Sequence, residues 1–180
     1  GFGSVNPAFN PGNGNLVLAY PNFNYQGTQL ASNVDASAME FLHVDIWVAA
    51  GTDRQVKVSP INAGSGVGEF LVNVPLSPGQ WNSVDLPKSS FTGMTWNAVN
   101  QLKFDGQFNG NGSANTTPFN IYLDNIYFYK AAAGGGGGGT SNIAANGGFE
   151  NGTTGWMLFQ NGGTAARDVT TNNGGAASGK

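Results

Sequence analysis

The chain has 180 residues, of which only 9% are charged, and its formal net charge is −3. Its seven Lys and Arg residues are too few for a nucleic-acid partner, because holding a phosphate backbone requires clustered basic side chains. The absence of cysteine excludes disulfides, thiolate metal sites and a cysteine nucleophile.

Short runs of alternating apolar and polar residues follow one another, separated by clusters of Gly, Pro, Asn or Ser. In chain order the predicted strands are Leu16–Tyr20, Gln29–Ser32, Glu40–Ala49, Gln55–Ser59, Glu69–Val74, Trp81–Leu86, Gln101–Phe104 and Phe119–Tyr129. A short helical turn is expected within Lys88–Met94, with Ser89 or Ser90 as its cap. Many short strands with short connections predict an all-β fold, an antiparallel β-sandwich of the jelly-roll type.

Six consecutive glycines, Gly134 to Gly139, divide the chain into two unequal parts. A glycine run has maximal backbone freedom and behaves as a flexible tether. We therefore expect a β-sandwich module over 1–130, an Ala/Gly linker over 131–140, and the N-terminal fragment of a second, truncated β module over 141–180. The alternative is that the tail pairs with a sheet edge of the first module or of a neighbouring chain.

The predicted strand Glu40–Ala49 carries apolar side chains at every second position. Because strand side chains alternate between faces, one face should point into the core and the other outward. The inward set is Leu42, Val44, Ile46 and Val48, and the outward set is Phe41, His43, Asp45 and Trp47. An outward Trp beside His and Asp indicates a binding surface, since exposed aromatic patches usually have a partner.

The predicted strand Gln101–Phe104 follows the same alternation, with Leu102 and Phe104 inward. If the two strands share a sheet, one surface collects His43, Asp45, Trp47, Gln101, Lys103 and Asp105. An aromatic plane packs against the C–H face of a sugar ring, while carboxylates, amides and ammonium groups bind its hydroxyls. The pattern therefore predicts a carbohydrate-binding surface.

The aromatic loop Tyr20–Gln29 adds Tyr25 to this surface as the wall of a groove. The alternative is that these residues form a solvated, salt-bridged face on which a loop covers Trp47. Catalysis is not expected, because the chain has one His, no cysteine and no GxSxG motif. A glycosidase-like pair formed by Asp45 and Asp105 is the form that a hydrolase would take.

Asp124 lies in the run YLDNIYF, where Leu123 and Ile126 cannot both point inward under strict alternation. A bulge at Asp124-Asn125 would reconcile them. A carboxylate and an amide at a bulge can join backbone carbonyls around a hard cation such as Ca²⁺. The alternative is that Asp124 caps local backbone N–H groups.

The segments NYQGTQLAS, MEFLHVDIWVA, VDLPKSSF, NQLKFDG and IYLDNIYFYK resemble a β-sandwich module of secreted Bacteroidetes proteins, often appended to laminarinases and chitinases. This resemblance covers roughly residues 16–130. It implies a jelly roll that binds polysaccharide without catalysis, with a β-1,3-glucan of the laminarin type as the leading ligand. It also implies a structural Ca²⁺ near the termini, with Asp124 matching the family's closing Asp.

The later segment NGGFENGTTGW is similar to the start of family 4 and 9 type carbohydrate-binding modules. The residues that carry this similarity are Phe149, Glu150, Gly152 and Trp156.

The sequence thus predicts a non-catalytic polysaccharide-binding module of a secreted or cell-surface multidomain protein, with a laminarin-like β-glucan as its expected ligand. The expected partners are a polysaccharide and other modules of the same polypeptide, with no nucleic acid. The sequence contains no apolar run of about 18 residues, so no membrane span is expected. The alternative function is a structural or adhesive module in a cell-surface filament or spacer.

Overall fold

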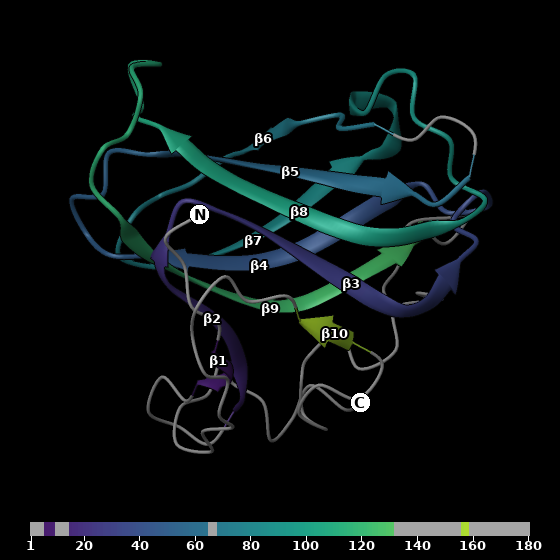
Figure 1. Cartoon of the computed structure of the whole chain (residues 1–180), viewed down its shortest axis with the longest axis horizontal. Coiled ribbons are helices and arrows are strands. Elements are labelled where there is room, and N and C mark those ends of the chain that lie inside the picture. The colour runs from purple at the N-terminus through teal and green to yellow at the C-terminus, as the bar shows by residue number, and fades with distance from the viewer. Residues whose placement is uncertain (1–5, 10–14, 65–67, 132–155, 159–180) are drawn as a thin grey trace.

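The chain folds as a β-sandwich of two antiparallel sheets, shown as a computed structural model in Figure 1. The structure describes residues 6–9, 15–64, 68–131 and 156–158. The strands are β1 Asn6–Phe9, β2 Val17–Phe23, β3 Tyr25–Val34, β4 Phe41–Val48, β5 Gln55–Asn62, β6 Val72–Val74, β7 Trp81–Pro87, β8 Val99–Phe108, β9 Phe119–Tyr129 and β10 Trp156–Leu158. Every predicted strand is present, so the all-β sandwich expected from the alternating pattern is confirmed.

Each sheet has five strands. One sheet, here called the β4 sheet, has the order β1-β2-β9-β4-β7, and the other, the β8 sheet, has the order β10-β3-β8-β5-β6. Figure 1 shows them as two layers, with β8 in one and β4 in the other. Sheets packed in this way lie about 10 Å apart, with the inward side chains of both filling the space between them.

The core consists of the inward side chains that alternation predicts. Leu42, Val44, Ile46 and Val48 of β4 are fully buried. They pack in one cluster with residues of the β8 sheet such as Leu102. Burial of this apolar surface is the main stabilising contribution to the sandwich.

The turn expected within Lys88–Met94 is a 3-10 helix over Lys88–Ser90. Its N-cap is Pro87, and no side chain forms a capping hydrogen bond. The prediction that Ser89 or Ser90 caps the turn is therefore wrong. Both serines lie inside the turn, because β7 runs on to Pro87 and places the first helical residue directly after it.

The tail contributes β10, which pairs with β3 at the edge of the β8 sheet, with Trp156 opposite Leu30. This is the edge pairing that the alternative interpretation of the tail expected. The rest of the expected second module, including Phe149, Glu150 and Gly152, lies outside the described residues, as does 132–140 of the linker. The division of the chain at the glycine run stays a prediction.

No helix among the described residues is long and apolar enough to span a membrane.

Candidate functional site

The topology separates the predicted binding residues into two groups. β4 and β8 belong to different sheets, and the outward side chains of each point away from the shared core. His43, Asp45 and Trp47 therefore lie on one outer surface, and Gln101, Lys103 and Asp105 on the opposite one. The expectation that all six share one surface is wrong, because alternation assigns a side chain to a side of its strand but not to a sheet.

The first surface, the β8 face, is formed by the outward side chains of β3, β8 and β5. Register places Tyr25 opposite Asp105, Gly27 opposite Lys103 and Gln29 opposite Gln101. The sequence placed Tyr25 in a loop, but it is the first residue of β3. The structure brings four predicted site residues together on this face, which are Tyr25, Gln101, Lys103 and Asp105.

Tyr25 is 41% exposed, which leaves its side chain open to a ligand. The Nζ atom of Lys103 lies 5.3 Å from the centre of this ring, within the range of a cation–π contact. The same Nζ lies 2.7 Å from Oε2 of Glu69 and 3.6 Å from Oδ2 of Asp105. Lys103 is therefore held between two carboxylates beside the Tyr25 ring, and Lys57, which lies opposite Asp105, supplies the second positive charge that balances them.

Gln101 lies flat across the neighbouring strand because Gly27 has no side chain. A Cβ atom at Gly27 would stand only 3.2 Å from Cδ of Gln101 and 3.3 Å from its Nε2 and Oε1. This contact is tighter than side chains ordinarily make. Gly27 therefore provides the space in which the Gln101 amide lies, next to Lys103 and Tyr25.

Asp105 is only 3% exposed, and both of its carboxylate oxygens accept hydrogen bonds. Oδ1 accepts a hydrogen bond from the backbone N–H of Gln107 at 2.9 Å, and Oδ2 accepts one from Gln107 Nε2 at 2.8 Å. Because buried charges must be paired and hydrogen-bonded, Asp105 acts as a fixed anchor for Lys103. It contributes little surface of its own to a ligand.

The second surface, the β4 face, is formed by the outward side chains of β7, β4 and β9. His43 lies at its middle, with Nδ1 at 2.7 Å from Oδ1 of Asp85 and Nε2 at 3.3 Å from Oδ1 of Asp45. Its ring stacks on that of Tyr127, with centroids 4.6 Å apart. Burial disfavours the charged imidazole, but the two carboxylates outweigh it and raise the pKa of His43.

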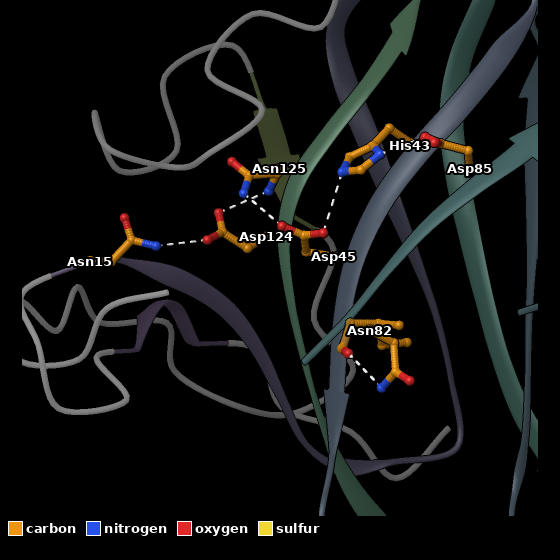
Figure 2. Close-up of polar contacts among 8 residues, drawn as sticks. Asn15, His43, Asp45, Asn82, Asp85, Asp124 and Asn125 are labelled. Carbon is orange, nitrogen blue, oxygen red and sulfur yellow. Dashed lines mark hydrogen bonds and ion pairs between the residues drawn. The ribbon is translucent and has the colours of Figure 1, made fainter. Parts of the chain in front are cut away.

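Asp45 continues this network toward β9, as Figure 2 shows. It is 8% exposed, and its Oδ2 accepts a hydrogen bond from Nδ2 of Asn125 at 2.7 Å. Burial alone would raise the pKa of Asp45, but hydrogen bonds from His43, Asn125 and Ser83 lower it. The alternative interpretation expected a solvated, salt-bridged face. At the centre of this face, however, His43 and Asp45 are buried and joined by polar contacts.

The bulge predicted at Asp124-Asn125 is confirmed. Asp45 is opposite Asp124 while His43 is opposite Tyr127, so β9 has one residue more than β4 between these pairs. Asn125 takes the positive φ of 47° that this bulge requires, a conformation that Asn tolerates better than most residues. Leu123 and Ile126 are both buried as a result.

Trp47 lies between two further aromatic residues. It is opposite Trp81 on β7 and opposite Tyr122 on β9, and its ring meets that of Tyr122 edge to face at 5.3 Å. All three are half-buried, so part of each ring is reached by solvent. Tyr122, Tyr127 and Asp85 are not among the predicted site residues, although alternation along β9 and β7 places them outward.

The carboxylate of Asp124 is fully buried beside the same network. Its Oδ1 accepts the backbone N–H of Asn125 at 2.8 Å, and its Oδ2 accepts Nδ2 of Asn15 at 2.7 Å. The first of these contacts is the local N–H capping that the alternative to a calcium site expected. Oδ1 of Asn15 is buried and has no partner among the described residues, which leaves one acceptor that a cation could use.

The two carboxylates considered for catalysis do not meet. Asp45 belongs to the β4 face and Asp105 to the β8 face, so the core of the sandwich separates them. A glycosidase pair requires carboxylates separated by roughly 5 to 9.5 Å around one sugar ring. Within the described ranges, no group of three or more His, Cys, Asp or Glu residues could hold a metal ion.

No protein-family model matches the chain, and no curated protein matches it. The solved structures similar to part of it include two family 11 carbohydrate-binding modules from Clostridium thermocellum. One belongs to a cellulosomal cellulase, and the other is in complex with a β-1,3-1,4-mixed-linked tetrasaccharide. Each is 17% identical with a TM-score of 0.44 over 65% of this chain, covering 75% and 76% of theirs. At this identity and TM-score the similarity does not determine the function.

Proposed function

We propose that this chain is a non-catalytic polysaccharide-binding module whose binding site lies on the β8 face. The observation that carries the proposal is the exposed side chain of Tyr25. It lies beside the Lys103 ammonium group, with Gln101 on the same face. An exposed, oriented aromatic ring next to a few placed polar groups is the arrangement that a sugar requires.

Each part of the β8 face has a chemical role toward a sugar. The Tyr25 ring offers a plane for the C–H face of a pyranose. The amide of Gln101 can both donate to and accept from hydroxyl groups, and Lys103 can only donate. Because Glu69 and Asp105 hold the Lys103 ammonium group beside the Tyr25 ring before a ligand arrives, little side-chain entropy of Lys103 is lost on binding.

The charge balance of the face favours a neutral polysaccharide. Lys103 is paired with Glu69 and Asp105, and Lys57 lies opposite Asp105, so these two ammonium groups and two carboxylates give the face no net charge to attract an acidic sugar. Laminarin, a β-1,3-glucan, is the first ligand to test, since the sequence motifs resemble modules appended to laminarinases. In a secreted multidomain protein such a module would raise the concentration of its neighbouring modules on the polysaccharide.

Replacing Tyr25 by Ala should weaken laminarin binding by about 1–3 kcal/mol, because stacking on one aromatic ring contributes roughly that much. This corresponds to a rise in Kd of roughly 5- to 150-fold. Tyr25→Phe retains the ring and should retain most of the affinity. Isothermal titration calorimetry with laminarin measures both, and an unchanged Kd in Tyr25→Ala would remove the β8 face from the site.

The same protein tests the alternative functions. A structural or adhesive module would bind none of a panel of polysaccharides but would associate with itself in light scattering. Release of reducing sugar from any bound polysaccharide would contradict the non-catalytic assignment.

We also propose a structural Ca²⁺ at the β9 bulge, held by Asp124 and by the unpartnered Oδ1 of Asn15. Ca²⁺ takes oxygen ligands, and carboxylate and amide oxygens are among its usual choices. Calcium should then raise the melting temperature relative to EDTA, and Asp124→Asn should abolish the difference. Equal melting temperatures with calcium and with EDTA would leave Asp124 with its N–H capping role alone.

A further inference from the structure

We propose that the β4 face is a second glycan-binding site, so that one module bridges two polysaccharide chains. This inference rests on the proposed function of the β8 face and adds a cross-linking activity to it. It arises because the sandwich places two mixed aromatic and polar surfaces back to back where the sequence suggested one.

The aromatic part of the second site spans three strands. Trp47 on β4 is flanked by Trp81 on β7 and by Tyr122 on β9, in register. The Cβ atoms of directly opposite residues on neighbouring strands lie about 4.5–5.5 Å apart, so the three aromatic side chains form one continuous patch. The edge-to-face contact between Trp47 and Tyr122 holds these two rings at fixed angles, with 67° between their planes.

The polar part follows directly along the same strands. The next outward row contains Asp45 with Ser83, and the row after it contains His43 with Asp85. The side chain of Asp85 is 49% exposed, and Ser83 is exposed, so both present oxygen atoms to a ligand. His43 fixes Asp85 by the hydrogen bond between Nδ1 and Oδ1 at 2.7 Å.

The length of the face suits a chain molecule. Trp47 and His43 are four residues apart on one strand, which corresponds to about 14 Å at 3.4 Å per residue. A ligand that stacks on the Trp47 patch and also reaches Asp85 must therefore extend along the strand. A polysaccharide meets this requirement, whereas a single sugar ring does not.

The charges of the face exclude other occupants. β4, β7 and β9 contain no Lys or Arg, while Asp45 and Asp85 lie along its centre, so an anionic ligand would be repelled. A protein sheet packed here would have to bury the half-exposed Asp85 carboxylate away from water, which is costly. Sugar hydroxyls replace water at such acceptors and can donate to them.

The two faces are independent because the core separates them. The inward side chains of β4 and β8 pack against each other between sheets that lie about 10 Å apart. One sugar cannot contact both Tyr25 and Trp47, so simultaneous occupation requires two chains or two distant parts of one chain. Binding at both faces then cross-links the polysaccharide.

The test uses the full chain with laminarihexaose in isothermal titration calorimetry and with long-chain laminarin in light scattering. We expect two sites per molecule for the unaltered protein, one of which is weakened about 5- to 150-fold in Tyr25→Ala and the other to a similar extent in Trp47→Ala, with both weakened in the double variant. Light scattering from mixtures with laminarin should rise for the unaltered protein but not for Tyr25→Ala, Trp47→Ala or the double variant. Trp47→Phe, which keeps a ring, should restore the second site, and Thr92→Ala, in an exposed turn outside both faces, should leave both sites in place.

Circular dichroism and melting temperature establish that each variant is folded before its sites are counted. One site per molecule, lost in Tyr25→Ala and unchanged in Trp47→Ala, would overturn the second site and leave the proposed function intact. One site that is lost in Trp47→Ala alone would also overturn bridging and would move the binding site to the β4 face. No binding to any glycan by the folded, unaltered protein would overturn the proposed function, and the second site with it.

Discussion

At the scale of single residues, His43 is the side chain with the most unusual surroundings. It lies on the outward side of β4 but is only 9% exposed, and it contacts one carboxylate through each ring nitrogen. The two carboxylates favour the protonated imidazole, and together they raise its pKa above the usual 6.5 despite burial. The protonated ring in turn satisfies Asp45 and Asp85 on a face without Lys or Arg.

This cluster predicts how stability depends on pH. A raised folded pKa means that the stabilisation from His43 is complete below about pH 6.5 and is lost as the pH rises through the folded value. The lowered pKa of Asp45 means that its stabilisation is complete above pH 3.8 and is lost as the pH falls through the lower folded value. The contribution of the pair is therefore greatest between these two limits.

Replacing His43 by Gln should remove the alkaline part of this dependence. The free energy of unfolding of the unaltered protein should fall between pH 6.5 and pH 9, and that of His43→Gln should stay flatter over the same interval. Urea unfolding at a series of pH values measures both curves. Parallel curves would show that the His43 charge makes no contribution to the folded state.

Residue-scale predictions from the sequence succeeded where they depended on one strand only. The inward positions of Leu42 and Val44 and the outward position of Trp47 follow from alternation alone. The near-complete burial of His43 and Asp45 could not be predicted in this way. It results from neighbours on β7 and β9 whose register is set by strand pairing.

At the scale of elements, β8 depends on a glycine that faces the core. A Cβ atom at Gly106 would lie 2.6 Å from Cε1 of Phe23 and 2.8 Å from Cε1 and Cζ of Phe119. The two rings meet edge to face, with centroids 5.4 Å apart. The aromatic packing at this end of the sandwich therefore occupies the space that a side chain on β8 would need.

Gly106→Ala should destabilise the protein by about 1–3 kcal/mol, the usual cost of adding volume to a packed core. Gly64→Ala is a matched control, because its Cβ would meet only the Asn62 amide nitrogen at an ordinary 3.5 Å. The control should change the free energy of unfolding by less than about 0.5 kcal/mol. Urea unfolding of the two variants checks the difference, and equal stability would mean that the rings of Phe23 and Phe119 yield without cost.

Elements also show where a departure from a rule is itself predictable. The apolar residues Leu123 and Ile126 break the alternation of β9, and the bulge that reconciles them is present at Asn125. The conflict between these two apolar positions was sufficient to predict the bulge, because a bulge involves only one strand and its neighbour. The cap of the 3-10 turn was not predictable in this way, since it depends on how far β7 extends.

At the scale of the whole molecule, the main consequence of the fold is that two candidate surfaces point in opposite directions. β3, β8 and β5 bring Tyr25 and Lys103 together, and β7, β4 and β9 bring Trp47 and His43 together. Neither surface is complete in any one segment of the sequence. Both are assembled from strands that are distant along the chain.

The sequence by itself determined most of the strands, the inward and outward sides of each of these, and the residue types available for binding. These properties are local, because side-chain alternation and turn residues act within a few positions of the chain. The tertiary structure alone decided which strands share a sheet, and hence that His43 and Lys103 lie on opposite faces. That choice is made by hydrogen bonds and core packing between segments far apart in sequence, for which a single strand carries no signal.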